Sequence, residues 1–388
     1  MKKKQKWYFF LITIGLLLCA TCIGFFLREQ TLANAEDHLV LSNANHVHRE
    51  MVSDGKTYKQ TVTLGAIGDI LIHDRVYMDA QVKDGYDFSP MLANVKEILV
   101  RPDLLLANQE TILGGIEIGL SGYPTFNSPR EVGDALIDAG VDIVSTANNH
   151  TLDKGEKGVQ SSMNYLNQVG LPYVGSFKNV GDKNRLRILN HNGVNIAYLS
   201  YTYGTNGIPI PEGKDFLVNL IDKEAMKEEI HRAKAKSDVV VMSIHWGNEY
   251  QRFPDDIQEE LARFIVNEGV DVVFGHHPHV LQPMEWIQAD DGRKSLVIYS
   301  LGNFLSGQMW DYKDIGGMAT IEIHKTVSPN GSAIELINPT FIPTYVSSSG
   351  QRNYRVVPLE EADKFGLEDA NSIYDEIMSH MMASLKEP

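Results

Sequence analysis

The strongest constraint on the fold is a repeated alternation between short apolar runs and segments with helical spacing. The apolar runs are rich in leucine or β-branched residues and have the length of buried strands: 62–67, 104–107, 143–146, 196–200, 239–244, 272–274 and 296–299. Apolar residues recur at helical spacing in the segments 90–100, 131–139, 158–168, 223–235 and 256–267. This alternation predicts an α/β protein with mainly parallel pairing near its centre.

The N-terminus has the pattern of a membrane anchor. Lys2, Lys3, Lys4 and Lys6 precede residues 7–27, an apolar run of 21 residues without a charge. A run of this length can cross a bilayer, and the lysines favour a cytoplasmic N-terminus with the rest of the chain outside. Residues 33–35, Ala-Asn-Ala, also fit a signal-peptidase site, so secretion after cleavage near Ala35 is the alternative.

These patterns predict four parts: a stub and signal anchor at 1–27, a polar tether at 28–60, an α/β domain at 61–358 and a helical tail at 359–388. The formal net charge is −15, and the positive residues near the N-terminus leave the exported part more acidic still. Because such a surface repels phosphates, we expect no nucleic-acid partner.

Polar residues that can bind metals follow most of the predicted strands. In an open α/β sheet, groups beyond the carboxyl ends of parallel strands meet in one crevice. Each residue alone has a simpler interpretation, as a turn cap, a paired charge or a hydrogen-bonded loop histidine. Their joint occurrence predicts a shared site, and the residues concerned are Asp69, His73, Asn108, Glu110, Asn149, His150, His245, His276, His277 and His279.

The donor set combines carboxylate and amide oxygens with imidazole nitrogens and has no thiol, since Cys19 and Cys22 both lie in the apolar run. Such donors suit Mn, Fe or Zn, as one or two ions. Two ions about 3.5–4 Å apart generate hydroxide and clamp a phosphoryl oxygen, so the predicted reaction class is metal-assisted hydrolysis.

Taken together, the motifs resemble the capsule synthesis protein CapA family, over approximately residues 62–345. They are Gly68-Asp69-Ile70, Asn108-Gln109-Glu110, Asn148-Asn149-His150, His245-Trp246-Gly247, Gly275-His276-His277-Pro278-His279 and Ser300-Leu301-Gly302-Asn303-Phe304. The resemblance implies a role in poly-γ-glutamate synthesis and export at the cell membrane. The implied partners are other membrane subunits of a polymer synthesis complex and an anionic polymer.

CapA domains in turn resemble calcineurin-like metallophosphoesterases, which implies a four-layer αββα sandwich. By this resemblance Asp69 and His279 are ligands of a first metal, Asn149, His245 and His277 are ligands of a second, and His150 is the acid beside the leaving group. Glu110 stands where that family has a bridging aspartate, and Leu71 stands where it has a histidine. These two departures leave the number of metals and the phosphatase turnover open.

The remaining candidates are predicted to bind substrate, namely His73, Arg75, Asn108, His276 and Asn303. Three functions stay open: an extracytoplasmic component of polymer assembly, a metal-dependent phosphodiesterase or phosphatase acting on an envelope metabolite, and a metal-free assembly scaffold.

Overall fold

The computed structural model describes residues 56–385, whose strands form two large sheets. The predicted anchor at 1–27 and the tether up to residue 55 lie outside the described residues. Within residues 56–385, no helix combines the length and apolar character needed to cross a bilayer.

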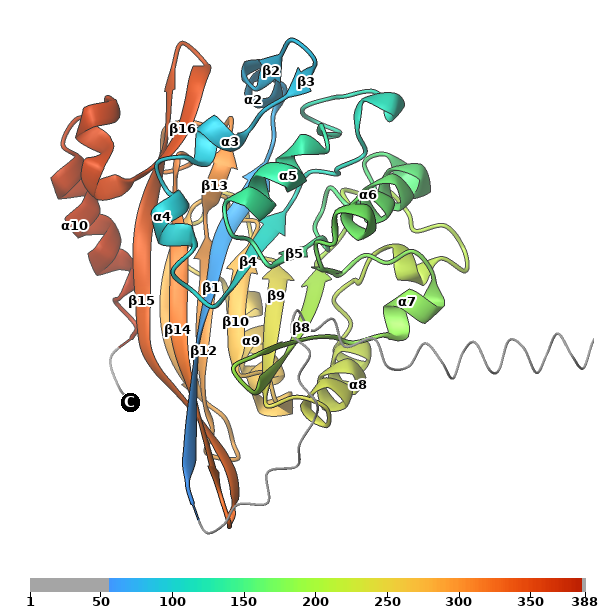
Figure 1. Cartoon of the computed structure of the whole chain (residues 1–388), viewed down its shortest axis with the longest axis vertical. Coiled ribbons are helices and arrows are strands. Elements are labelled where there is room, and N and C mark those ends of the chain that lie inside the picture. The colour runs from blue at the N-terminus through green and yellow to red at the C-terminus, as the bar shows by residue number, and fades with distance from the viewer. Residues whose placement is uncertain (1–55, 386–388) are drawn as a thin grey trace, which may run out of the picture. The chain divides into compact units, whose positions relative to one another are not determined.

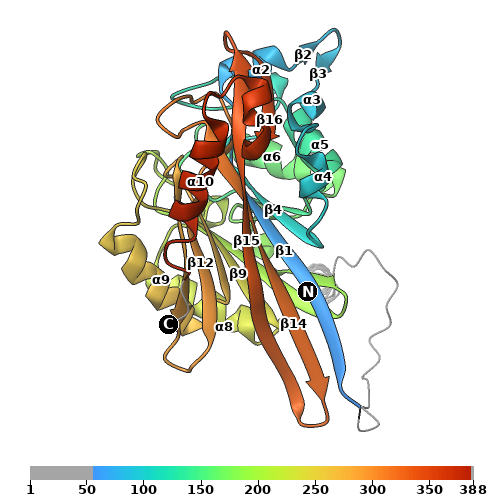
Figure 2. The same cartoon turned by 90° about the vertical axis from the view of Figure 1, so that its left-hand side faces the viewer.

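The first sheet is mixed, and β1 (Tyr58–Leu71) lies at its centre. This strand runs parallel to β4 (Leu104–Gln109) and β13 (Asn303–Ser306), and antiparallel to β14 (Ile315–Ser328). The sheet continues through β5 (Ile143–Ser145) and β6 (Tyr173–Val174) on one side, and through β15 (Gly331–Ser349) and β16 (Arg352–Pro358) on the other. Figure 2 shows β1, β14 and β15 extending as a long antiparallel arm below the other strands.

The second sheet has the order β11-β12-β10-β9-β8-β7. Its central strands β8, β9, β10 and β12 pair in parallel, and β7 and β11 close its edges in antiparallel fashion. The bounds are β7 (Arg187–His191), β8 (Val194–Thr202), β9 (Val239–His245), β10 (Val272–His276), β11 (Leu281–Gln288) and β12 (Lys294–Leu301). A small hairpin of β2 (Gln81–Val82) and β3 (Gly85–Tyr86) stands apart.

Helices cover the outer face of each sheet (Figure 1), whereas α10 (Ala370–Met381) packs against the hydrophobic cluster between the sheets. α5 (Glu131–Asp138) and α6 (Gly155–Val169) pack on the first sheet, and α8 (Lys223–Lys234) and α9 (Asp256–Glu268) pack on the second. The others are α2 (Asp74–Asp79), α3 (Ser89–Leu92), α4 (Lys96–Leu99) and α7 (Val180–Asn184), with 3-10 turns at η1 (Ile116–Ile118), η2 (Asp215–Leu217) and η3 (Leu359–Phe365).

Alternation along the strands produces the layers, because successive side chains of a strand point to opposite faces. In β1, Ile67 packs against the helices, whereas Leu64 and Ala66 pack against the second sheet. In β9, Val241 faces the first sheet and Met242 faces α8 and α9. The described residues therefore form four layers: helices, sheet, sheet, helices.

All seven predicted strands are present, and the mixed α/β class is confirmed. The predicted helix at 90–100 is wrong as a continuous element, because the chain forms two single turns, α3 and α4, on either side of residues 93–95. β1 starts at Tyr58, inside the segment expected to be tether, and the tail from 359 forms η3 and α10. The antiparallel strands β14, β15 and β16 were not anticipated.

Candidate metal centre

The carboxyl ends of strands from both sheets meet at one buried cluster of polar side chains. From the first sheet, Asp69 lies near the end of β1, Glu110 directly follows β4, and Asn149 lies in the turn after β5. From the second sheet, His245 ends β9 and His276 ends β10. His277 and His279 follow at once, and all of these side chains are buried.

A close approach of two glycines sets the position of Asp69. A β-carbon on Gly68 would lie 2.0 Å from the carbonyl oxygen of Gly302, so only glycine fits there. The same carbonyl accepts a hydrogen bond of 2.8 Å from the Asp69 amide. The sequence Gly68-Asp69 therefore fixes the carboxylate against the start of β13.

Asp69 is held as an ionised acceptor. The Asn108 amide donates to Asp69 Oδ1 over 2.8 Å, and His279 Nδ1 donates to Oδ2 over 3.0 Å. His276 Nδ1 lies 3.3 Å from Oδ1. Burial alone would raise the pKa of Asp69, but the contacts with His276 and His279 outweigh it and hold the pKa well below its usual range.

Glu110 is the least satisfied group of the cluster. Its side chain is fully buried, and neither carboxylate oxygen has a hydrogen-bond partner. The nearest basic atoms are His245 Nε2 at 3.6 Å and His279 Nε2 at 3.7 Å from Oε1. Burial, together with the charge of Asp69, raises the pKa of Glu110 well above its usual range. A buried carboxylate without donors is expensive unless a cation neutralises it.

The histidines divide into two protonation states. Burial and the neighbouring His279 lower the pKa of His277 to about 3. Burial, followed by the charge of His277, lowers that of His245 well below its ordinary value. Burial opposes protonation of His279 as well, but Glu110 and Asp69 outweigh it and raise its pKa to about 9. Neutral imidazole is the form that binds metals, so an ion here would displace one proton from His279.

Backbone strain accompanies the histidine turn. His277 has φ 97° and His279 has φ 58°, values in the left-handed region that residues with a β-carbon rarely adopt. Such strain persists where the surroundings hold a side chain in a required direction. Both rings thereby face the cluster, with centroids 5.8 Å apart.

The donor atoms form two triplets that share Glu110. One triplet is Asp69, Glu110 and His279, and the other is Glu110, His245 and His277; in each, the donor atoms lie within 4.8 Å of one another. Asn149 Oδ1 lies 2.8 Å from His245 Nε2, beside the second triplet. The orphaned Glu110 oxygens and the mixed oxygen and nitrogen donors fit one or two divalent ions such as Mn, Fe or Zn.

His150 lies at the edge of the cluster and has its own carboxylate partner. Its Nδ1 is 2.7 Å from Asp153 Oδ2, and its ring packs edge-on against Phe126 with centroids 4.7 Å apart. Asn206, in the loop after β8, contacts His150 Nδ1 at 3.4 Å and Asn149 Nδ2 at 3.3 Å. The acid role of His150 stays a prediction.

The residues predicted to bind substrate divide between the cluster and its border. Asn108 and His276 contact Asp69 directly. His73 lies further out, where its Nδ1 accepts a hydrogen bond of 3.2 Å from the Gly307 amide. Asn303 donates to Gln308 Oε1 over 3.0 Å, and Arg75 lines a separate pocket beside Gly307.

Sequence reasoning missed one candidate ligand. Glu249 is exposed, and its carboxylate forms a third group of close donors with His277 and His279. The signal that could have found it is its position four residues after His245, in the turn that follows β9. Asp153, the partner of His150, was also missed, although it lies three residues further along the chain.

Fold and site together define a four-layer α/β protein with a histidine and carboxylate cluster at the junction of its two sheets. Residues 63–308 match the family described as "Bacterial capsule synthesis protein PGA_cap". The chain belongs to this bacterial capsule synthesis family.

Two curated relatives are similar to this chain. "Capsule biosynthesis protein CapA" of Bacillus anthracis is 33% identical over 238 residues, which cover 58% of this chain and 55% of that protein. "PGA biosynthesis protein CapA" of Bacillus subtilis (strain 168) is 33% identical over 183 residues, covering 47% of each chain. The chain thus spans about half the length of the curated relatives it matches.

Among solved structures, the chain is similar to the 5'-nucleotidase precursor from Thermus thermophilus. The identity is 15% and the TM-score 0.44, over 82% of this chain and 59% of the other.

Proposed function

We propose that this chain is an extracytoplasmic component of poly-γ-glutamate capsule biosynthesis or export, held at the membrane by residues 1–27 and working with other membrane subunits. Membership of the capsule synthesis family supports the cellular role, as do the printed names of the two Bacillus relatives. The apolar run behind four lysines supports the location.

We further propose that the cluster is a metal centre of metallophosphoesterase type. The observation that carries this proposal is Glu110, a fully buried carboxylate without a hydrogen-bond partner, placed between two groups of donor atoms. Asp69, Glu110 and His279 would hold one ion, and Glu110, His245 and His277 a second, with Asn149 beside it. A bound divalent ion supplies Lewis acidity toward a carbonyl or phosphoryl oxygen and lowers the pKa of bound water.

The chain's own groups would then orient the substrate and move a proton. Asp153 accepts from His150 Nδ1, which fixes the imidazole and leaves Nε2 to face a leaving group. Asp69 stays ionised because of its histidine and amide contacts. Phe126 packs against the rings of both His73 and His150 and limits their movement.

A second candidate function is hydrolysis of a phosphoester envelope metabolite without any role in a capsule. The His150–Asp153 pair favours it, because an oriented histidine beside a metal centre is the arrangement that general acid catalysis requires. The third possibility, a metal-free scaffold, requires that the ligands be dispensable.

Elemental analysis of the full chain, purified without chelator, tests the metal centre. A generic phosphodiester assay on the same preparation, with His150→Asn as the variant, tests catalysis. Bound metal with hydrolysis that depends on His150 supports the enzyme, and bound metal without hydrolysis supports a binding or assembly role.

Polymer yield in the bacterium that carries the chain tests the capsule role. We expect Asp69→Asn and His277→Ala to lower the yield, with the exposed Glu260→Gln as the matched control. Normal polymer from both variants would support the metal-free scaffold instead.

A further inference from the structure

A pocket with a volume of about 300 Å³ opens beside the candidate metal centre. Its lining includes two cationic side chains, Arg75 and Lys313, and two aromatic ones, Tyr250 and Trp310. None of these four belongs to the groups of metal-binding donors. Its size is at the lower end of the range for small-molecule sites.

The pocket shares a wall with the metal centre. The Tyr250 ring lies 6.2 Å from the ring of His279, measured between centroids. Gln308 bridges the two regions, because it donates to the Tyr250 hydroxyl over 3.3 Å and accepts from Asn303 over 3.0 Å. The pocket and the cluster are therefore neighbours, separated by the side chains of Tyr250 and His279.

Arg75 offers an unused positive charge. Its Nε is buried without a hydrogen-bond partner, and among residues 56–385 no hydrogen bond or ion pair engages its guanidinium group. Gly307 makes room for it, since a β-carbon there would lie 2.6 Å from the Arg75 Nε. A guanidinium group left in this state suits a carboxylate or phosphate.

Lys313 supplies the second charge. Its ammonium group lies 5.2 Å from the centroid of the Tyr250 ring and 3.3 Å from the carboxylate of Asp311. The Asp311 side chain is 87% exposed, so this ion pair is weak and solvent screens it. Of the other nearby acids, Asp314 accepts from the Trp310 amide over 3.0 Å, and Glu249 interacts with the Tyr250 hydroxyl.

The segment that carries Trp310 is strained and firmly held. Trp310, Asp311 and Tyr312 have φ values of 61°, 50° and 65°, three consecutive residues in the left-handed region. Asn303 donates to the Lys313 carbonyl over 2.8 Å, and the Arg252 guanidinium lies 3.9 Å from the centre of the Tyr312 ring. Such strain costs of order 1–3 kcal/mol for each residue, so the surroundings must hold the segment in place.

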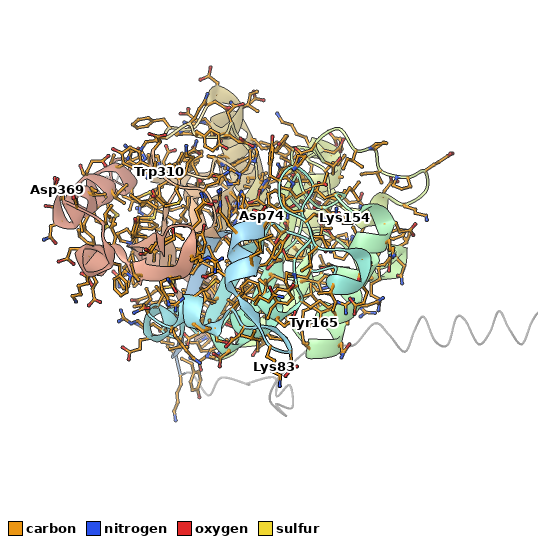
Figure 3. All side chains as sticks on the ribbon, turned by 90° about the horizontal axis from the view of Figure 1, so that it is seen from above. Asp74, Lys83, Lys154, Tyr165, Trp310 and Asp369 are labelled. Atoms are coloured by element: carbon orange, nitrogen blue, oxygen red, sulfur yellow. The ribbon has the colours of Figure 1, made fainter. Side chains whose placement is uncertain are left out.

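In the view from above, Trp310 projects between Asp369 and Asp74 (Figure 3). Its side chain is 70% exposed. An exposed indole at the mouth of a cationic pocket offers an apolar surface that the methylene groups of a ligand can cover.

We propose that this pocket binds the carboxylates of a γ-linked glutamate chain next to the unit that lies at the metal centre. The inference rests on the proposed capsule function and names the polymer as the ligand of this site. An acidic protein repels a polyanion at long range, but the lining of this pocket carries two cations and no acid, so it favours a carboxylate locally. Gln308 supplies amide donors and acceptors for the polymer's peptide groups, and Trp310 contacts its methylene groups.

Binding of a fluorescent γ-linked glutamate oligomer to the purified full chain, followed by anisotropy, tests the proposal. We expect Arg75→Gln and Lys313→Gln each to weaken binding about tenfold, because each removes one charge-assisted contact. Gly307→Ala is a second route to the same loss, since its methyl group displaces the Arg75 guanidinium group. Lys227→Gln, a remote lysine paired with Glu268, is the matched control and should bind as the unmodified chain does.

Metal content and the midpoint of thermal unfolding show that each variant is folded and loaded. Unchanged affinity in Arg75→Gln and Lys313→Gln, or no binding to the unmodified chain, would overturn the proposal. Displacement of the oligomer by inorganic phosphate at equal concentration, or equal affinity for an α-linked glutamate oligomer, would overturn the choice of ligand. Normal capsule in Asp69→Asn cells would count against the proposed function and leave the binding result valid.

Discussion

Replacing Glu110 with glutamine is expected to remove the stabilisation that metal gives while leaving the metal-free fold intact. The carboxylate belongs to both donor triplets, so its loss weakens the binding of an ion at either one. Glutamine has the same shape and carries no charge. In the metal-free protein the change removes a charge that burial disfavours and also the attraction that raises the pKa of His279, so its two effects on the fold oppose each other.

The expected rise in Tm on metal binding follows from the linkage between binding and folding. A ligand at a hundred times its Kd stabilises the folded state by about 2.7 kcal/mol. The described part has 330 residues, for which the unfolding entropy is about 0.7 kcal/mol/K, so Tm should rise by about 4 °C. In Glu110→Gln the same metal concentration should raise Tm by less than about 1 °C.

Thermal unfolding followed by circular dichroism, first in EDTA and then with Mn²⁺ or Zn²⁺, measures both quantities. Glu260→Gln, an exposed carboxylate paired with Lys223, is the control and should keep the full metal-induced shift. A full shift in Glu110→Gln would refute the shared-ligand reasoning. A Tm in EDTA many degrees below that of the unmodified chain would show that Glu110 acts in the fold itself.

Three further outcomes are expected. In EDTA, the raised pKa of His279, about 9, stabilises the fold fully below the ordinary value of 6.5, and this stabilisation is lost as the pH rises through 9. Denaturant unfolding below pH 6.5 and above pH 9 should show the loss. An equal loss in His279→Gln would contradict the prediction. Gly68→Ala should destabilise the fold by roughly 3 kcal/mol, because its methyl group would collide with the carbonyl oxygen of Gly302. Gly204→Ala, which has open space around it, is the control and should be nearly neutral in the same denaturant assay. Asp182→Asn should lower the free energy of unfolding by about 2–3 kcal/mol, since it breaks a largely buried pair with Arg187; a urea midpoint equal to that of the unmodified chain would contradict this.

Much of the cluster could be predicted because a local pattern and a topological rule were enough. Asp69, Glu110 and His245 each stand at or directly after the end of an apolar run, and parallel strands bring such ends together. The sequence could not show that Glu110 is left without a partner, because that depends on distances between residues of both sheets.

The parts that escaped prediction depend on long-range pairing or on unusual backbone geometry. β14 and β15 have alternating and partly exposed faces, and they become strands by pairing with β1 and with each other. The pocket around Lys313 depends on three consecutive residues with left-handed backbone, and no residue pattern in that segment predicts this conformation. Glu249 is exposed in a turn, and from the sequence it resembles an ordinary solvated acid. Only the fold brings His277 and His279 close to it.

The course of β1 has a consequence for where the centre can work. The strand enters the described part at Tyr58, paired with Val327 near the tip of the long arm, and reaches Asp69 only at its other end. Eleven residues of extended chain span about 36 Å. Within residues 56–385, this strand is therefore a rigid arm that separates the start of the described chain from the candidate centre by about that distance.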